Sequence, residues 1–289
     1  MRVLVTGATG FIGKQVVKQL NDSGVDVVTM GRRPSNSANQ HFKLDFLATE
    51  DFSTQFKEAR ASHLIHLAWY VEHGKFWSST MNMDWIKTTA NLVDAFCKGG
   101  GQHITIAGSC AEYDWDYGVC NEEHTPLNPR SVYGIAKNAT RQICQITCAK
   151  AEVPLAWGRI FTPYGKSEPT TRLLPSLAEV FKKNKAPFGV NLDSYRDFLH
   201  VTDVANALIS LSIGNAKGNI NISSGEPVRL REIVELMAGK MAADPAMVLE
   251  LSSNRLDEPK YLVGTNDCLL GLGWNKRVSL VDGLNDFYK

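Results

Sequence analysis

Tyr133 and Lys137 lie four residues apart in the run Ser-Val-Tyr-Gly-Ile-Ala-Lys at 131–137. Residues with this spacing share one face of a helix, one turn from each other. A lysine ammonium close to a phenol favours the phenolate, so it lowers the tyrosine pKa from its usual value of about 10. Tyr133 is therefore a candidate proton donor and acceptor near neutral pH. The same spacing also describes an ordinary pair on a helix surface, so the interpretation depends on what surrounds it.

Ser109 is the second candidate, because it directly follows the segment at 102–108 that we predict to be a strand. In a doubly wound sheet, ligands bind beyond the carboxyl ends of the strands. A serine in that cleft can hydrogen-bond a substrate carbonyl or alkoxide. The structural alternative is a serine that closes a turn at the end of a strand.

Gly7, Gly10 and Gly13 span the turn that leads from an apolar segment at 3–5 into a helical pattern over 11–20. The first glycine allows a tight turn, the second lets a pyrophosphate approach the backbone, and the third lets the helix pack close to the strand. The helix N-terminus then faces the phosphates. The spacing is Gly-x-x-Gly-x-x-Gly instead of the commoner Gly-x-Gly-x-x-Gly, but the strand-to-helix context is the one that a dinucleotide-binding turn requires.

The second predicted strand, at 25–30, ends in Gly31, Arg32 and Arg33. A carboxylate that would bind the ribose 2′-hydroxyl of NAD is missing there, whereas the two arginines suit a 2′-phosphate. We therefore expect NADP(H) to be preferred, with NAD(H) as the alternative; arginines that are simply solvated are the structural interpretation. Asp45, after a short strand at 41–44, is a candidate to bind the adenine amino group or to close a turn.

Apolar strand candidates alternate with helical segments along the chain. Strands are predicted near 2–6, 25–30, 41–44, 63–68, 102–108, 155–161 and 219–222, and helices near 11–23, 51–59, 78–98, 134–151, 171–183, 202–213 and 229–240. This alternation predicts an α/β fold, a Rossmann-like doubly wound parallel sheet with a smaller C-terminal α/β substrate-binding part. We expect residues 1–160 to form the NAD(P)-binding domain, with a return segment near 196–223, and residues 161–289 to form mainly the substrate-binding part.

The 289 residues are 44% hydrophobic and carry a net charge of +1. The near-zero charge argues against nucleic acid and anionic membranes as partners, and no apolar run is long enough to span a bilayer. The N-terminus is predicted to be strand and cofactor turn instead of a signal peptide. The six cysteines have no zinc-type spacing, so we expect no metal site and a reduced, cytoplasmic protein.

Several further segments add to the catalytic candidates, and together they resemble the extended short-chain dehydrogenase/reductase family over nearly the whole chain. The segments that carry the resemblance are the turn Thr6–Gly13, the strand end His66–Trp69, the helix residue Asn82, the triad Ser109, Tyr133 and Lys137, the segment Arg196–Val201 with Asp203, Arg255 with Glu258-Pro259, and Gly271–Trp274. The family contains UDP-galactose 4-epimerase and many nucleotide-sugar reductases.

The resemblance implies a role for each matching residue. Tyr133 would protonate the alkoxide during reduction, Lys137 would hold the nicotinamide ribose, and Ser109 would polarise the carbonyl. Arg196 and Arg255 match arginines that grip the diphosphate of a nucleotide sugar, a task for which the planar guanidinium is suited. His200 lies in the same segment and is predicted to be structural.

The complete set of predicted binding residues follows from the turn, the strand ends and the resemblance. The cofactor-binding residues are Gly7, Thr9, Gly10, Phe11, Ile12, Arg32, Arg33, Asp45, Phe46, Leu67, Ala68, Trp69, Asn82, Tyr133 and Lys137, and the substrate-binding residues are Ser109, Cys110, Leu174, Arg196 and Arg255. The expected partner is a nucleotide-diphosphate sugar, dTDP-, CDP- or GDP-linked. The family also implies a homodimer through the helices near 78–98 and 134–151, and Ile135, Ile143 and Ile146 are compatible with such an interface.

Differences between this sequence and the motifs of the family's subgroups reduce the number of reactions that the protein could catalyse. Cys110 and Ala111 stand where the 4,6-dehydratases carry an acid/base carboxylate pair, so dehydration lacks its catalysts. Ala111 also replaces the epimerising cysteine of GDP-fucose synthase, and Cys110 is predicted to be a packing residue. A 4-ketoreductase that uses NADPH on a nucleotide-linked 4-keto-6-deoxyhexose is favoured over a 4-epimerase that retains NAD. A non-catalytic NADP(H) sensor is a third interpretation, disfavoured because the triad is complete. The sequence does not identify the nucleotide, the sugar or the C4 stereochemistry.

Overall fold

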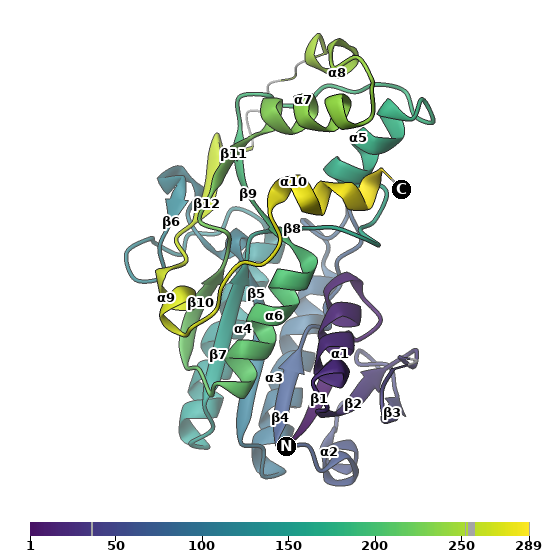
Figure 1. The fold of residues 1–289 in the computed structure, drawn as a ribbon. Helices are drawn as coiled ribbons and strands as arrows, with labels where there is room; N and C mark the ends of the chain where they lie inside the picture. The colour runs from purple at the N-terminus through teal and green to yellow at the C-terminus, as the bar shows by residue number, and fades with distance from the viewer. Residues whose placement is uncertain (36, 252, 254–257, 289) are drawn as a thin grey trace.

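The computed structural model describes residues 1–35, 37–251, 253 and 258–288. A large parallel sheet with helices on both faces forms the lower part of Figure 1, and a smaller part lies above it, beyond the carboxyl ends of the strands. The catalytic candidates lie where the two parts meet.

The large sheet has seven strands in the order β10-β7-β5-β4-β1-β2-β3, and every neighbouring pair is parallel. Its strands are β1 (Arg2–Thr6), β2 (Asp26–Gly31), β3 (Gln40–Lys43), β4 (His63–His66), β5 (His103–Ser109), β7 (Leu155–Ile160) and β10 (Gly218–Ile222). The central strands are buried on both faces, and some of the residues they bury are polar, such as His63 in β4, Thr105 in β5 and Arg159 in β7. The predicted Rossmann-like α/β fold is confirmed.

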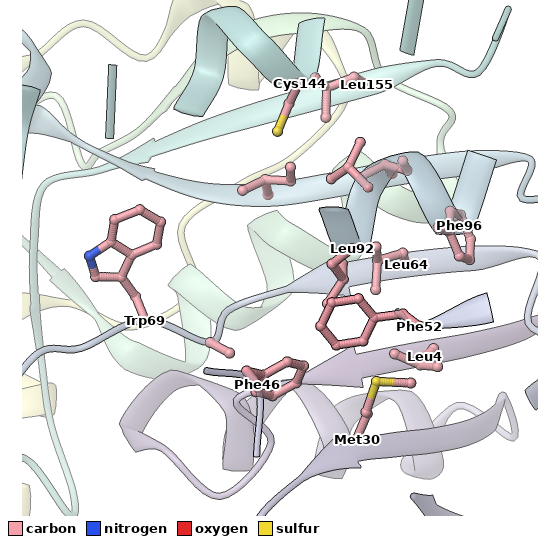
Figure 2. Packing of buried hydrophobic residues seen from close by; sticks show 14 of the residues in the cluster. Leu4, Met30, Phe46, Phe52, Leu64, Trp69, Leu92, Phe96, Cys144 and Leu155 are labelled. Carbon is pink, nitrogen blue, oxygen red and sulfur yellow. The ribbon is translucent and has the colours of Figure 1, made fainter. Parts of the chain in front are cut away.

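The two faces of the sheet are covered by different helices. Helices α1 (Phe11–Asp22) and α6 (Val201–Ile213) pack on one face, where alternate strand residues such as Val5 and Ile65 join their core. The other face is covered by α2 (Ser53–Ala59), α3 (Met81–Lys98) and α4 (Val132–Lys150). Figure 2 shows the core of this second face, with Trp69 at its edge.

A second sheet in the smaller part has the order β11-β9-β12-β6, with β8 paired to β9. Its strands are β6 (Val119–Cys120), β8 (Thr162–Tyr164), β9 (Tyr195–His200), β11 (Pro227–Arg229) and β12 (Tyr261–Gly264). The helices of this part are α5 (Leu173–Phe181), α7 (Leu230–Lys240), α8 (Ala246–Leu249) and α10 (Leu280–Gly283), whereas α9 (Asp267–Gly271) packs against β10 of the large sheet, where its Leu269 joins the core. Short 3₁₀ turns are η1 (Cys110–Glu112), η2 (Trp115–Tyr117) and η3 (Leu284–Phe287).

The chain returns from the smaller part to the large sheet through α6 and β10, which pairs with β7. Assignment of the two parts to cofactor and to substrate stays a prediction. Within the described residues, no helix has the length and apolarity needed to cross a membrane.

Candidate active site

The glycine turn forms a cradle that has no room for side chains. Gly7 has a φ of +68°, and a Cβ there would lie 2.8 Å from the backbone N of Ala68. A Cβ at Gly13 would lie 2.1 Å from the carbonyl oxygen of Gly7. Gly10 is the N-cap of α1 without a side-chain cap, and the first helical turn carries no acidic residue. The exposed N–H groups at this helix end therefore fit the phosphates of a dinucleotide.

Thr6 and His66 fix the neighbouring strand ends beside this cradle. The Thr6 hydroxyl lies 2.7 Å from Nδ1 of His66 and accepts hydrogen bonds from the backbone N–H groups of Leu67 and Ala68. Nε2 of His66 lies 3.2 Å from the Thr89 hydroxyl. Burial lowers the pKa of His66 to about 3, so its imidazole is neutral and holds the predicted cofactor-binding segment in place.

The ends of β2 and β3 hold the residues predicted to contact the adenosine half of the cofactor. Arg32 and Arg33 are exposed, and neither forms an ion pair with any residue that the structure describes. Asp45 accepts a hydrogen bond from the N–H of Leu47 at 3.1 Å and so closes a turn; its contact with adenine stays a prediction. The ring of Phe46 points into the core, as Figure 2 shows, which leaves its backbone as the part that a cofactor could contact.

The structure brings Ser109, Tyr133 and Lys137 together. Ser109 is the last residue of β5, and the other two lie in the first turns of α4. The N-cap Ser131 accepts a hydrogen bond from the N–H of Gly134 at 3.0 Å. A Cβ at Gly134 would lie 2.2 Å from the carbonyl oxygen of Ala111, so this glycine lets the start of α4 pack against the Ser109 turn.

The electrostatics of Tyr133 differ from the expectation. Burial raises the pKa of Tyr133, because it disfavours the phenolate, and a hydrogen bond with Ser109 opposes the rise only in part. The prediction that Lys137 lowers the pKa of Tyr133 is wrong for the structure as it stands. The Lys137 ammonium donates to the carbonyl of Ala107 at 2.9 Å instead of to the phenol. The phenol of Tyr133 is consequently protonated in this environment, and its role as proton donor stays a prediction.

The Lys137 ammonium also lies over two aromatic rings, that of Trp69 and, at 5.9 Å, that of Tyr133. Nζ of Lys137 lies 3.8 Å from the centroid of the indole ring, a cation–π geometry. Burial lowers the pKa of Lys137 to about 7, and the Glu112 carboxylate opposes this change. The indole N–H of Trp69 donates to Oδ1 of Asn82 at 2.8 Å, and the Asn82 amide donates in turn to the carbonyl of Phe76 at 2.7 Å. Asn82, predicted to bind cofactor, thus anchors the segment at 70–80.

That segment places aromatic rings around Tyr133, which sequence reasoning missed. The rings of Phe76 and Trp77 lie 4.8 and 5.7 Å from the Tyr133 ring, both nearly perpendicular to it. Trp115 lies 6.0 Å from Trp77. We call Phe76, Trp77 and Trp115 the aromatic wall. The sequence signal was only the adjacent pair Phe76-Trp77 ahead of a helix, which on its own indicates no position in the fold.

The residues predicted to bind substrate are only partly brought together. Arg196 in β9 donates to the carbonyl of Pro259 at 2.8 Å and lies 3.5 Å from the Glu258 carboxylate. Burial raises the pKa of the Cys110 thiol to about 12. A neutral, buried thiol is consistent with the predicted packing role of Cys110.

The other two residues predicted to bind substrate, apart from Ser109, are Leu174 and Arg255. The side chain of Leu174 is 1% exposed and belongs to the core of the smaller part, which leaves its backbone as the part that a substrate could contact, and its place in the substrate site stays a prediction. It lies in the first turn of α5, whose apolar residues face that core. Arg255 lies outside the described residues.

Residues 3–222 match the sequence model of the NAD dependent epimerase/dehydratase family. The chain belongs to this family. It is 27% identical to dTDP-6-deoxy-L-talose 4-dehydrogenase (NAD(+)) from Aggregatibacter actinomycetemcomitans over 242 residues, which cover 81% of this chain and 88% of the relative. It is 24% identical to UDP-glucose 4-epimerase from Streptomyces lividans over 322 residues, 95% of this chain and 91% of the relative.

Solved structures agree with this membership. MoeE5 in complex with UDP-glucuronic acid and NAD is 26% identical, with a TM-score of 0.84 over 99% of this chain and 97% of that one. The UDP-glucose 4-epimerase of Thermus thermophilus, in complex with NAD, has a TM-score of 0.86 over 100% of this chain and 98% of that one; at 22% identity it shows the fold alone. The resemblance drawn from the sequence motifs is thereby confirmed, and the relatives are enzymes named for reactions on nucleotide sugars.

Proposed function

We propose that the protein is an NADP(H)-dependent reductase that acts on the 4-keto group of a nucleotide-linked 4-keto-6-deoxyhexose. The observation that carries this proposal is the buried, protonated Tyr133, hydrogen-bonded to Ser109 at the carboxyl edge of the sheet. A reductase needs a proton donor at the substrate oxygen, and a phenol with a raised pKa keeps its proton across the physiological range.

Each member of the triad has one task in this mechanism. The cofactor, when bound, supplies the hydride that reduces C4. Ser109 hydrogen-bonds the carbonyl oxygen and stabilises the negative charge that develops on it. Tyr133 donates its phenolic proton to that oxygen, so the ketone becomes an alcohol and Tyr133 becomes a phenolate. The Lys137 ammonium stabilises the phenolate until a proton from solvent restores it, and holds the nicotinamide ribose.

The preference for NADP(H) rests on Arg32 and Arg33. Both are exposed at the end of β2, where a 2′-phosphate would lie, and no carboxylate competes for the ribose at that position. The two solved relatives described above hold NAD, so NAD(H) is the competing assignment. The predicted contacts of the cofactor with Thr9, Phe11, Ile12 and the Leu67–Trp69 segment belong to this same proposal.

The 6-deoxy character of the sugar is supported by the aromatic wall. Phe76 and Trp77 surround Tyr133 with apolar ring surface, which suits a methyl group at C6 better than a hydroxyl or a carboxylate. The likeness to an enzyme named as a dTDP-6-deoxy-L-talose 4-dehydrogenase points in the same direction. The proposed substrate is accordingly a dTDP-, CDP- or GDP-linked sugar, with Arg196 and Arg255 at its diphosphate.

A nucleotide-sugar 4-epimerase that retains NAD is the second candidate. It is favoured by the similarity to several UDP-glucose 4-epimerases at 24–26% identity over nearly the whole chain. The complete triad makes a non-catalytic NADP(H) sensor the weakest candidate.

We also propose that the protein acts as a homodimer in the cytoplasm. Ile135 and Ile146 on α4 are 54% and 60% exposed, and Met83 on α3 is 66% exposed. Large apolar side chains on two adjacent helices suit an interface between two copies of the chain. A monomer by light scattering at micromolar concentration would contradict the dimer.

The test begins with the cofactor content of the purified protein and its oxidation of NADPH in the presence of dTDP-4-keto-6-deoxyglucose. Protein that arrives without cofactor and consumes NADPH in proportion to added sugar is the expected result. Protein that arrives with tightly held NAD and catalyses no net oxidation would overturn the reductase and favour the epimerase.

A further inference from the structure

A buried carboxylate that the triad mechanism does not use lies directly behind Ser109. Glu112 ends the 3₁₀ turn η1, and its side chain is 0% exposed. Its Oε1 accepts hydrogen bonds from the backbone N–H of Ser109 at 2.8 Å and from the indole N–H of Trp157 at 2.9 Å. Its Oε2 accepts from Nε of Arg159 at 3.0 Å. The charge is therefore paired, and both carboxylate oxygens are used.

Arg159 connects this carboxylate to a buried hydrogen-bond network that reaches both sheets. Its guanidinium is 1% exposed and donates to the hydroxyl of Tyr113 at 3.0 Å. That hydroxyl donates to Oδ1 of Asn221 at 2.7 Å, and the Asn221 amide donates to the backbone carbonyl of Cys120 at 3.0 Å. The network thus joins β7, β10 and β6, and none of these strands can move without breaking buried hydrogen bonds.

Ser109 is held by this network from two directions. Its N–H donates to Glu112, while its own Oγ accepts from the N–H of Ala111 at 3.1 Å, which together form a capping box. The space around the pair is tight, because a Cβ on Gly108 would lie 2.7 Å from Oε1 of Glu112 and 2.2 Å from the indole nitrogen of Trp157. The backbone of the turn and the direction of the Ser109 hydroxyl are therefore fixed together.

We propose that Glu112 is a positioning residue, which sets the Ser109 hydroxyl at hydrogen-bonding distance from Tyr133 and from the substrate carbonyl. The part of this inference that concerns catalysis rests on the proposed function, because it assumes that Ser109 acts on a ketone. Glu112 does not touch substrate, and it acts through the backbone of Ser109. A small displacement of a catalytic group lowers the rate steeply, which is why such a contact matters.

The isosteric change Glu112→Gln removes the hydrogen bond that positions Ser109 but keeps the side-chain volume that packs in the core. The side-chain amide has one oxygen and one NH₂ group in place of two carboxylate oxygens. The buried cation of Arg159 attracts the amide oxygen most strongly, so the NH₂ group faces the N–H of Ser109 and offers it no acceptor. The turn then loses its anchor while the volume of the side chain is unchanged.

Tyr113→Phe is the matched control. It removes the hydroxyl that joins Arg159 to Asn221, and so breaks the same buried network, but it leaves the bond between Glu112 and Ser109 in place. Any effect that comes only from a weakened core should appear in both variants. Glu112→Asp is the second test variant and also serves if Glu112→Gln does not fold. It keeps the negative charge that pairs with Arg159, but its side chain is too short to hold the backbone N–H of Ser109 at the same distance.

Two measurements test the proposal. Amide hydrogen exchange of the peptide covering 107–113 reports on the Ser109 anchor whether or not the protein is a reductase. We expect faster exchange there in Glu112→Gln than in wild type or Tyr113→Phe, with the peptides of α1 unchanged. Steady-state kinetics should show kcat reduced by about 10²-fold in both Glu112→Gln and Glu112→Asp. Glu112→Asp keeps the negative charge that favours the Lys137 ammonium, so a loss in both variants arises at Ser109 and not at Lys137, and the Kd for NADPH should be unchanged in Glu112→Asp.

The two measurements distinguish rejection of the role proposed for Glu112 from rejection of the reductase function. Wild-type protein that reduces no nucleotide sugar, with faster exchange at 107–113 in the variant, would leave the anchor supported and reject the reductase. Equal exchange in Glu112→Gln and wild type would reject the anchor, whatever the activity. Equal losses of kcat in Glu112→Gln and Tyr113→Phe would make Glu112 a structural residue only.

Discussion

Replacing Trp69 with leucine should move the pH dependence of the reaction toward acid. The indole ring lies 3.8 Å from the Lys137 ammonium, within the range of a strong cation–π contact. For a desolvated cation such a contact is worth about 2 kcal/mol. At 1.36 kcal/mol for each tenfold change in the protonation equilibrium, its loss lowers the lysine pKa by about 1.5. The pKa of Lys137 is about 7 in the intact protein, where burial is the main cause of its depression.

The sign of the effect follows from the role of the ammonium. A charged Lys137 stabilises the phenolate that Tyr133 becomes after it has donated its proton, so kcat/KM for reduction falls as pH rises through the lysine pKa. In Trp69→Leu that fall should begin about 1.5 pH units earlier than in wild type. The ammonium also contacts the Ala107 carbonyl and the Tyr133 ring, and its charge interacts with Glu112, Cys144 and the neutral His66; the substitution removes none of these groups.

The assay is the pH profile of kcat/KM for NADPH oxidation between pH 5 and pH 9, because this parameter reports the pKa values of the free enzyme. Trp85→Phe is the matched control, since Trp85 stacks on Trp69 at 5.8 Å but is not in contact with the ammonium. An unchanged profile in Trp69→Leu would refute the cation–π argument. A profile displaced toward alkali would mean that water enters the vacated space and that burial by the indole, instead of its π face, sets the lysine pKa.

The other predictions concern the proton donor, the cofactor and the fold. Tyr133→Phe should lower kcat by about 10²–10⁴-fold, because the general acid is lost, while the Kd for NADPH measured by calorimetry stays within about twofold; retained turnover would remove Tyr133 from the mechanism. Glutamate at both Arg32 and Arg33 should weaken NADPH binding at least tenfold and leave NADH binding unaffected, because only the 2′-phosphate is repelled; equal losses for both cofactors would reject the NADP(H) assignment. Gly13→Ala should lower the melting temperature or abolish cofactor binding, since its Cβ would lie 2.1 Å from a carbonyl oxygen. In wild type the free energy of unfolding should rise with pH above about 7, because the unfolded chain retains the Lys137 proton that the folded chain has lost, and urea titrations of Lys137→Met should lack that part of the rise.

The large sheet was predictable from the sequence because its strands are buried on both faces. Val3–Val5 is apolar without alternation, residues 104–109 carry Ile104 and Ile106 beside β-branched or small neighbours, and the helices between the strands have clear periodicity. The second sheet was not predicted, because its strands lack such a pattern. β6 has two residues, β8 contains Pro163, and β9 carries a buried carboxylate at Asp197.

Asp197 illustrates why local patterns fail in that sheet. Its carboxylate accepts from the N–H groups of Ser224 at 2.7 Å and Gly225 at 3.0 Å, which are distant in the sequence. A charged residue in a strand is disfavoured unless such partners are present, and the partners become visible only when the chain has folded.

The triad was predictable in position but not in electrostatics. The spacing of Tyr133 and Lys137 on one helix is local, and the end of β5 places Ser109 beside them. The direction of the Lys137 ammonium depends instead on Trp69, which comes from the end of β4. The depth of burial, which raises the pKa of Tyr133, likewise depends on the aromatic wall and on contacts between distant segments.

The tryptophans near the triad give the protein a built-in optical signal. Of its six tryptophans, Trp69, Trp77, Trp85 and Trp115 are linked by ring contacts around Tyr133. Indole emission overlaps the absorption of a reduced nicotinamide but not that of an oxidised one, so energy transfer should occur only while the cofactor holds its hydride. Excitation of the unlabelled enzyme would therefore report each hydride transfer as a change of colour in its own fluorescence, and a single turnover could be followed without any added dye.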